Sequence, residues 1–277
     1  MDHPQRIASA ILGLVLLTIG TACSQKDIGD SDLGSKTDTA SLHSLRRELE
    51  QIRNHFPGDM SIYMKNLSTA EEIALDSDKV YETFSVIKLA IAAELMHQVE
   101  SGKLSLSDRI ITRAADERLP SGVLYALEPG LSPTIKDLLT LMIITSDNEA
   151  TDLLADKLGR AQVTAYMHAL GLANTSIQFS DLDWDRTWLG TLDARYRNAR
   201  GDQTVNFPFS KYSQAQVEQA FGHTIYDAGV FFGHSTTKEI GRLLETMASG
   251  KLVPKDASEL ILNIRRSNRS TTGFPDI

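Results

Sequence analysis

The sequence has almost no cysteine and no excess of basic residues. One cysteine in 277 residues excludes an intrachain disulfide as a support for the fold. Aspartate and glutamate (36) outnumber lysine and arginine (28), so the net charge is -8, and no basic cluster would attract a nucleic-acid backbone. We therefore expect no nucleic-acid partner. With 42% hydrophobic residues and no excess of proline or glycine, the composition is typical of an ordinary globular protein.

The N-terminus carries an uncharged apolar run. Residues 7–19 follow Arg6 and are too few to span a bilayer comfortably, but they have the length of a secretory signal segment. The only cysteine, Cys23, comes next in the stretch IGTACS, which resembles a bacterial lipobox whose cysteine is lipidated. Gly20 stands where leucine is usual in that box, so cleavage after Ala22 by an ordinary signal peptidase is the alternative.

These features predict how the chain is divided. We expect a signal peptide at 1–22 and a polar linker at 23–41, lipid-anchored or free, because this linker is nearly devoid of large apolar groups. A folded domain then covers 42–277. Both alternatives at the cysteine place the protein outside the cytoplasm, in the periplasm or at the cell surface of a bacterium, and lipidation adds a membrane anchor.

Hydrophobic periodicity predicts a helix and then a hairpin at the start of the folded part. The helix carries one apolar stripe, formed by Leu42, Leu45, Leu49, Ile52 and Phe56. The next stretch, MSIYMKN, alternates as a half-buried strand does, with one side made of Met60, Ile62 and Met64. A turn leads to a second strand, EEIAL, and these two strands are the only ones that the pattern predicts.

Further helices follow. In SPTIKDLLTLMIIT we expect Ser132 to be the N-cap and Pro133 the first helical residue. Two more helices, ATDLLADKLG and RAQVTAYMHALG, end at Gly159 and Gly171.

The periodicity fades beyond these helices. Residues 172–233 predict a long loop with one short helix near QAQVEQAF. A capping-box pattern at Thr236 and Glu239 then starts an amphipathic helix. A last helix, ASELILNIRR, precedes RSTTGFPDI.

The stretch TFSVIKLAIAAEL places a serine three residues before a lysine at the start of an apolar helix. Positions i and i+3 share a helix face, so Ser85 and Lys88 are close enough to interact. A buried amine with a lowered pKa can take a proton from a serine and make it a nucleophile. A helix cap followed by a surface lysine is the alternative, since about one S-x-x-K arises by chance in a chain of this length.

A second polar motif, TSDN, follows an apolar helix. Alone, Ser146, Asp147 and Asn148 indicate a turn or a helix start. Together, S-x-x-K and S-D-N in these helical contexts resemble the class A β-lactamases and penicillin-binding proteins, across residues 42–277.

The resemblance implies a role for each matching residue. Ser85 is the acyl-accepting nucleophile, and its backbone N–H supplies one oxyanion donor. Lys88 shares in its deprotonation. Ser146 relays a proton toward the leaving nitrogen, and Asn148 binds the substrate's side-chain amide and orients Lys88. Asp147 stabilises the turn that presents its neighbours.

The resemblance also implies a mixed α/β (α+β) fold, in which an antiparallel sheet flanked by helices lies beside an all-helical subdomain. The substrate would be a small β-lactam or a peptidoglycan-like amide, hydrolysed without metal or organic cofactor by a monomer. Two rivals stay open. One is a penicillin-binding or D,D-peptidase-like enzyme, and the other is a non-catalytic lipoprotein that uses the same fold as a binding module.

The sequence departs from the family's pattern in two places. The E-x-x-L-N loop that positions the hydrolytic water is missing, and Asp181, in SDLDWD, lies nearest to its place, with Asp183 as the alternative. No K-T-G is present, and TTG at 271–273 has threonine where the cation belongs. We therefore expect that the C-terminal strands are missing from this sequence, through truncation or through natural loss.

Other candidates are weaker. The DLDWD run has Arg186 where an EF-hand calcium loop needs glycine, so we expect no calcium site. His223 and His234 are too isolated to indicate a metal. His97 lies among apolar residues on the helix that follows Ser85, and we expect it to be a packing residue. Tyr125, in VLYALEPG, is a candidate aromatic at the mouth of the site.

Overall fold

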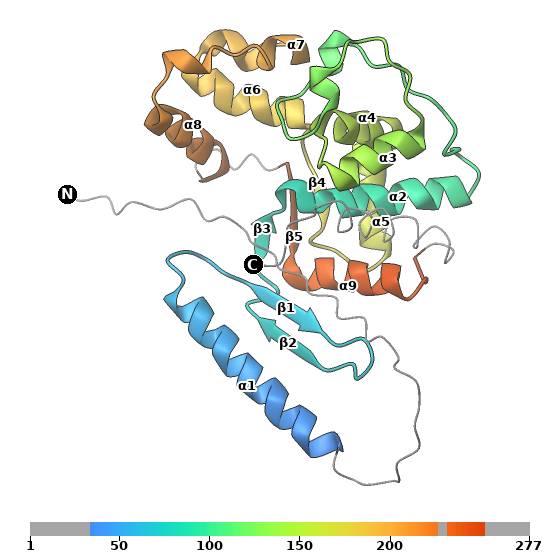
Figure 1. Cartoon of the computed structure of the whole chain (residues 1–277), viewed down its shortest axis with the longest axis vertical. Coiled ribbons are helices and arrows are strands. Elements are labelled where there is room, and N and C mark those ends of the chain that lie inside the picture. Colours follow the sequence, from blue (N-terminus) through green and yellow to red (C-terminus); the bar gives the residue numbers. More distant parts are fainter. Residues whose placement is uncertain (1–33, 227–231, 253–277) are drawn as a thin grey trace, which may run out of the picture. The chain divides into compact units, whose positions relative to one another are not determined.

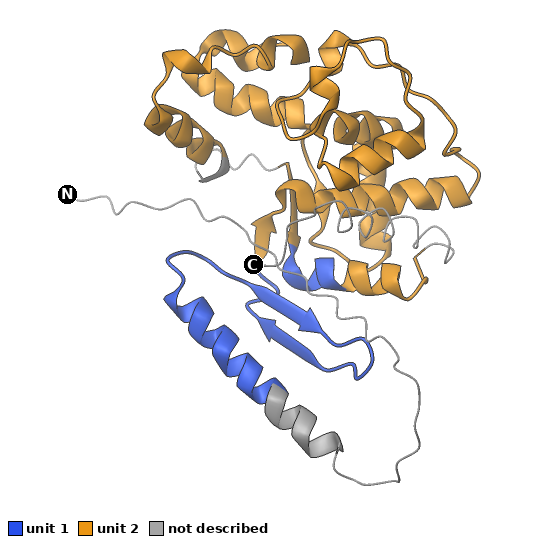
Figure 2. Ribbon diagram, in the orientation of Figure 1, with its two compact units in different colours: residues 1–79, 236–241 blue, residues 80–235, 242–277 orange. Residues whose placement is uncertain are grey.

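The computed structural model describes residues 34–226 and 232–252, with side chains from 42 to 224 and from 232 to 252. The chain divides into two compact units, which Figure 2 colours separately. Unit 1 holds residues 1–79 and 236–241, and unit 2 holds 80–235 and 242–277. The signal segment with Cys23, the helix ASELILNIRR and the TTG stretch lie outside the described residues. In the part of the chain that the structure does describe, no helix is long and apolar enough to cross a membrane.

Unit 1 contains the predicted helix and hairpin. Helix α1 (Gly34–His55) begins within the segment predicted as a polar linker, and Leu45 and Ile52 of its apolar stripe stay exposed. Strands β1 (Ile62–Lys65) and β2 (Glu72–Leu75) pair antiparallel, as the alternation predicted.

The buried side of β1 is the one opposite Met60, Ile62 and Met64. Tyr63 is the buried residue of this strand, whereas Ile62 and Met64 are only half-buried. The reason lies at Gly241, on the part of helix α9 (Thr237–Ala248) that belongs to unit 1, because a Cβ there would lie 2.3 Å from the Tyr63 ring. The missing side chain leaves room for the tyrosine.

Unit 2 is built around helix α2 (Lys88–Glu100), which follows the short 3-10 helix η1 (Phe84–Ile87) (Figure 1). The α2 residues Ala90, Ile91, Ala92, Ala93 and Leu95 are fully buried. Helix α2 is buried on several sides because it packs against α3 (Ile135–Ile144), α4 (Asn148–Leu158) and α5 (Arg160–Ala169). Ser85 lies in the 3-10 helix η1, and Lys88 is the first residue of α2.

The start of α3 differs from the prediction. Thr134, not Ser132, is the N-cap: its hydroxyl accepts a hydrogen bond from Asp137 N, and Asp137 Oδ2 accepts one from Thr134 N. This reciprocal capping box starts the helix after Pro133. At the predicted C-terminal ends of α4 and α5, Gly159 (φ 86°) and Gly171 (φ 79°) adopt the left-handed backbone that favours glycine.

A second, three-stranded sheet was not predicted. Its order is β3 (Val80–Glu82), β5 (Gly233–Thr236) and β4 (Ser176–Ile177), and β4 pairs antiparallel with β5. Strands β3 and β4 are three and two residues long, too short for a period-2 pattern, and β5 (GHST) has no large apolar residue to alternate.

The short helix predicted near QAQVEQAF is confirmed as α8 (Gln214–Tyr226), but the prediction of a long loop over the rest of 172–233 is wrong. Besides α8, this region holds β4, α6 (Asp181–Leu192) and α7 (Gly201–Thr204), together with the 3-10 helices η4 (Ala194–Asn198) and η5 (Phe209–Lys211). The described part of the chain has two further 3-10 helices, η2 (Ala114–Asp116) and η3 (Leu124–Ala126). Helix α6 was missed because buried Asp185 interrupts its apolar face.

Candidate active site

A chain of hydrogen bonds joins the two serines to the lysine. Lys88 Nζ donates to Ser146 Oγ at 2.9 Å, and Ser146 Oγ donates to Ser85 Oγ at 2.8 Å. Lys88 is buried, whereas Ser85 is exposed to solvent. The motif residues, 61 positions apart in the sequence, thus form one continuous proton path that ends at an accessible hydroxyl.

The junction between α3 and α4 places Ser146 over Lys88. Ser146 has a φ of 55°, a left-handed conformation that is uncommon for a residue other than glycine. Its carbonyl accepts hydrogen bonds from Lys88 Nζ at 2.6 Å and from the Ser121 hydroxyl at 2.9 Å. Asn148 Oδ1 accepts a third bond from Lys88 Nζ at 2.9 Å, and its amide nitrogen donates to Leu119 O. All three ammonium protons therefore have acceptors.

Asp147 holds the turn together. Its Oδ1 caps α4 by accepting from Ala150 N, and its Oδ2 accepts from Val123 N at 2.6 Å and Leu124 N at 3.0 Å. The carboxylate therefore ties the S-D-N turn to the 122–124 loop. Gly122 (φ 121°) lies against it, where a Cβ would come within 2.4 Å of the carboxyl group.

The surroundings of Lys88 act on its charge in opposite directions. Burial lowers the pKa of Lys88 because the charged form loses hydration, while Asp181, Asp147 and Asp152 raise it. Burial is the larger effect, so the pKa lies below its ordinary value. The shift favours a neutral amine, the form that can accept a proton.

Asp181, and not Asp183, belongs to this cluster. Asp181 is the first residue of α6, and burial raises its pKa well above the ordinary value, helped by Asp152 and opposed by Lys88. Its buried Oδ2 has no hydrogen-bond partner among the described residues. Asp183 instead accepts from Ser180 Oγ and pairs with Arg186, away from the lysine.

Asp152 was not singled out from the sequence. Its buried carboxylate pairs with Arg118 at 2.6 Å and with Arg160 at 2.9 Å. It also accepts from the backbone N–H groups of Asp181 at 3.0 Å and Leu182 at 3.3 Å. One signal was available: Asp152 lies four residues after Asn148, so an acidic residue continues the inner face of the helix that follows S-D-N.

Two more buried carboxyl groups lie near this network. Burial raises the pKa of Asp185 to about 7, although Trp188 Nε1 donates to it at 3.2 Å. Burial and Asp147 together raise the pKa of Glu149 to about 7.

The other sequence candidates lie elsewhere. His97 stacks on Tyr166 with ring centroids 4.4 Å apart, which confirms its packing role. His234 contacts Ser176 and Gln178, and no group of residues suited to a metal occurs within 42–224 and 232–252. Tyr125 is 37% exposed and follows Leu124, which is bound to Asp147.

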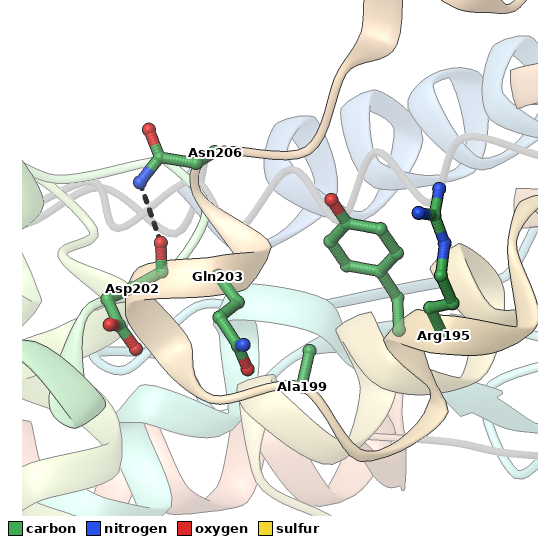
Figure 3. Close-up of a pocket in the computed structure, with 6 residues that line it drawn as sticks. Arg195, Ala199, Asp202, Gln203 and Asn206 are labelled. Atoms are coloured by element: carbon green, nitrogen blue, oxygen red, sulfur yellow. Dashed lines mark hydrogen bonds between the residues drawn. The ribbon is translucent and has the colours of Figure 1, made fainter.

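A separate hollow of about 350 Å³ is lined by Arg195, Tyr196, Ala199, Asp202, Gln203 and Asn206 (Figure 3). Two of these residues are hydrogen-bonded, with Asn206 Nδ2 donating to Asp202 O, as Figure 3 shows. The lining includes none of the residues of the Ser85 cluster.

The fold and the serine–lysine–serine arrangement define the β-lactamase and penicillin-binding class of proteins. The profile of the β-lactamase enzyme family matches residues 44–276, and the chain belongs to this family. The chain is 28% identical over 143 residues to β-lactamase L2 of Stenotrophomonas maltophilia, covering 51% of this chain and 44% of that protein. It is 27% identical over 141 residues to the β-lactamase regulatory protein BlaB of Streptomyces cacaoi, covering 50% and 44%.

Among solved structures, the fold resembles that of PBP-A, with a TM-score of 0.60 and 20% identity, over 80% of this chain and 68% of that one. The match to the two curated relatives, β-lactamase L2 and BlaB, spans less than half of the length of each.

Proposed function

We propose that this protein is an exported serine hydrolase that opens β-lactams through an acyl-enzyme on Ser85. The observation that carries the proposal is the hydrogen-bonded path from Lys88 through Ser146 to Ser85. Membership of the β-lactamase enzyme family supports the choice of β-lactams as substrates.

The first step would be acylation of Ser85. When Lys88 is neutral, the path reverses: Ser85 donates its proton to Ser146 Oγ, and Ser146 passes its own proton to Lys88 Nζ. Ser85 Oγ then bonds to the lactam carbonyl carbon, and the C–N bond of the ring breaks. Ser146 gives a proton to the leaving nitrogen and takes one back from Lys88, so the amine is neutral again. The lowered pKa of Lys88 supports its part as the base.

The second step would be hydrolysis of the ester on Ser85. Asp181 is the base we propose for the attacking water, because its buried Oδ2 carries no other hydrogen bond within the described segments. Water gives a proton to this carboxylate, and its oxygen bonds to the acyl carbon. As the ester bond breaks, the carboxyl group of Asp181 passes that proton on to Ser85 Oγ, so both groups return to their starting forms. Asn148 would orient the substrate's side-chain amide, as well as Lys88.

The raised pKa of Asp181 favours a second candidate. An aspartic acid that stays protonated is a poor base, so an acyl group would leave slowly, as in a penicillin-binding or D,D-peptidase-like enzyme. A third candidate is a non-catalytic binding module. The observation that favours a binding module is the similarity to BlaB, which is described as a regulatory protein.

Labelling with a fluorescent penicillin separates the three candidates. A label that appears on the full chain and is lost within seconds to minutes supports the lactamase, and a label that persists for hours supports the penicillin-binding alternative. Ser85→Ala is the control and is expected to remain unlabelled. The catalytic proposal fails if the wild-type protein and Ser85→Ala give the same signal.

We also propose that Cys23 carries the lipid anchor and that the protein acts as a monomer. Growth with labelled palmitate and fractionation of the cells test the anchor. The wild-type protein is expected to incorporate the lipid and to sediment with membranes, whereas Cys23→Ser should do neither. Incorporation of equal label into both proteins would contradict the lipidation.

A further inference from the structure

Glu82 is a buried carboxylate at the end of β3, three residues before Ser85. Its side chain is 4% exposed. Its Oε1 accepts from Phe84 N at 2.9 Å and from Gly233 N at 3.2 Å, and its Oε2 accepts from Phe232 N at 2.8 Å. One carboxylate therefore binds both the turn that carries the nucleophile and the start of β5, the strand beside β3 in Figure 1.

The turn that Glu82 binds has an unfavourable backbone conformation. Phe84 has a φ of 43°, in the left-handed region that bulky residues avoid. Such a conformation persists only where neighbouring contacts enforce it. The Phe84 ring packs edge-on to Trp184 at 6.2 Å and stacks with Phe221 at 6.4 Å, and its N–H is held by Glu82.

Phe84 directly precedes Ser85, so its backbone direction sets where the nucleophile points. A change of the Phe84 dihedral angles would rotate the Ser85 hydroxyl away from Ser146, which now lies 2.8 Å from it. Misplacement of a reacting group by about 1 Å can cost roughly 100-fold in rate.

The position requires a carboxylate and not only a side chain of this size. Both oxygens of an ionised carboxylate accept hydrogen bonds, which matches three N–H donors that converge on it. Burial raises the pKa of Glu82, and the hydrogen bonds from Phe84, Gly233 and Phe232 oppose that shift by stabilising the anion. An amide would turn an N–H donor toward at least one of these N–H groups.

We propose that Glu82 is a positioning residue for the acylation step, whose carboxylate fixes the Phe84 turn against β5 and so aims Ser85 Oγ at Ser146. The inference rests on the proposed function of Ser85. It extends that function to a residue that touches neither the substrate nor the proton path.

The test compares acylation of the full chain and of Glu82→Gln over a range of penicillin concentrations. Glu82→Gln should lower the saturating acylation rate constant by roughly 10- to 100-fold. The concentration that gives half the maximal rate should stay close to the wild-type value, and one label per molecule should still form. Glu94→Gln is the matched control, because Glu94 is a buried glutamate of α2 that hydrogen-bonds Gln98, and its rate constant should equal the wild type's.

A merely structural role gives a different result. In that case Glu82→Gln would lower the fraction of molecules that label and the midpoint of thermal unfolding, but the folded molecules would still react at the wild-type rate. That outcome overturns the inference. If Glu82→Gln does not fold, amide exchange of the wild-type protein decides: slow exchange at Phe84 N supports the inference, and fast exchange overturns it.

The two proposals fail in distinguishable ways. If the wild-type protein takes no label on Ser85, the proposed function fails and the positioning role fails with it. If the wild-type protein labels and Glu82→Gln labels at the same rate, only the positioning role fails.

Discussion

Lys88 Nζ lies 2.9 Å from the hydroxyl of Ser146 and 2.6 Å from the carbonyl of the same residue. Two bonds from one ammonium group to one residue fix Ser146 in its left-handed conformation and direct its hydroxyl to Ser85. The lysine thus orders the proton path and also forms one end of it.

Ser146→Ala should break the path from Lys88 to Ser85 and reduce the acylation rate by about 10²- to 10⁴-fold, the usual contribution of positioned proton transfer. The φ of 55° costs alanine about as much as serine, so folding should change little.

Ser121→Ala is the control for this change. It removes a hydroxyl that bonds the same residue, but only at its carbonyl, so the loss should stay within about tenfold. Equal losses for Ser121→Ala and Ser146→Ala in stopped-flow acylation would argue against the relay.

Gly122→Ala should disturb the S-D-N turn. The added Cβ would come within 2.4 Å of the Asp147 carboxyl group, which must then give up its bonds to the 122–124 loop. Gly130→Ala controls for backbone strain, since Gly130 also has a positive φ (98°) but no atom within 4 Å of the new Cβ. We expect Gly122→Ala to lower the free energy of unfolding by about 2 kcal/mol more than Gly130→Ala in urea titrations. If both substitutions lower the free energy of unfolding equally, the contact between Gly122 and Asp147 does not contribute to stability.

Asp152→Asn should be strongly destabilising. It leaves buried Arg118 without its carboxylate and weakens the contacts that start α6, so we expect a loss of about 3–5 kcal/mol in the free energy of unfolding. Asp156→Asn removes the exposed partner of Arg160 and should cost less than about 1 kcal/mol. A loss at Asp152 as small as that at Asp156 would show that the buried pair contributes little.

The pKa of Asp185 predicts how stability depends on pH. Its folded value of about 7 lies above the ordinary 3.8, so the folded state binds the proton more tightly than the unfolded chain. The stability from this group is present below about pH 4 and is lost as the pH rises toward 7. Asp185→Asn, which resembles the neutral acid, should remove that decline.

Partial burial raises the pKa of Asp183, but its bonds to Ser180 and Arg186 outweigh that effect, so the pKa lies below the ordinary 3.8. Asp183→Asn should therefore remove a stabilisation that is present above about pH 4 and is lost as the pH falls further. Urea titrations from about pH 2 to 8 measure both trends, and a decline that is unchanged in Asp185→Asn would contradict the assignment.

The elements with regular apolar spacing could be predicted from the sequence, and so could the motif residues. The hairpin, α2, α4 and α5 have that spacing. The two motifs predict Ser85, Lys88, Ser146 and Asn148 as site residues, and the structure brings these four together. Their catalytic roles stay predictions.

Features that depend on distant partners could not be predicted. The burial of Tyr63 follows from a glycine 178 positions later in the sequence, and α6 carries Asp185 on its buried face. Glu82 looks like any strand-end glutamate until Gly233, the first residue of β5, and Phe232 just before it each supply an N–H donor. Each case depends on contacts between segments far apart in the chain, which local periodicity does not report.

The central claim is that a β-lactam acylates Ser85. Mass spectrometry of the full chain after brief exposure to penicillin, followed by peptide mapping, tests it most directly. We predict a gain of one intact penicillin mass, located on the peptide that contains Ser85 and absent from Ser85→Ala. The absence of an adduct at every time from milliseconds to hours, with penicillin left unhydrolysed, or an adduct that persists in Ser85→Ala, would contradict the account.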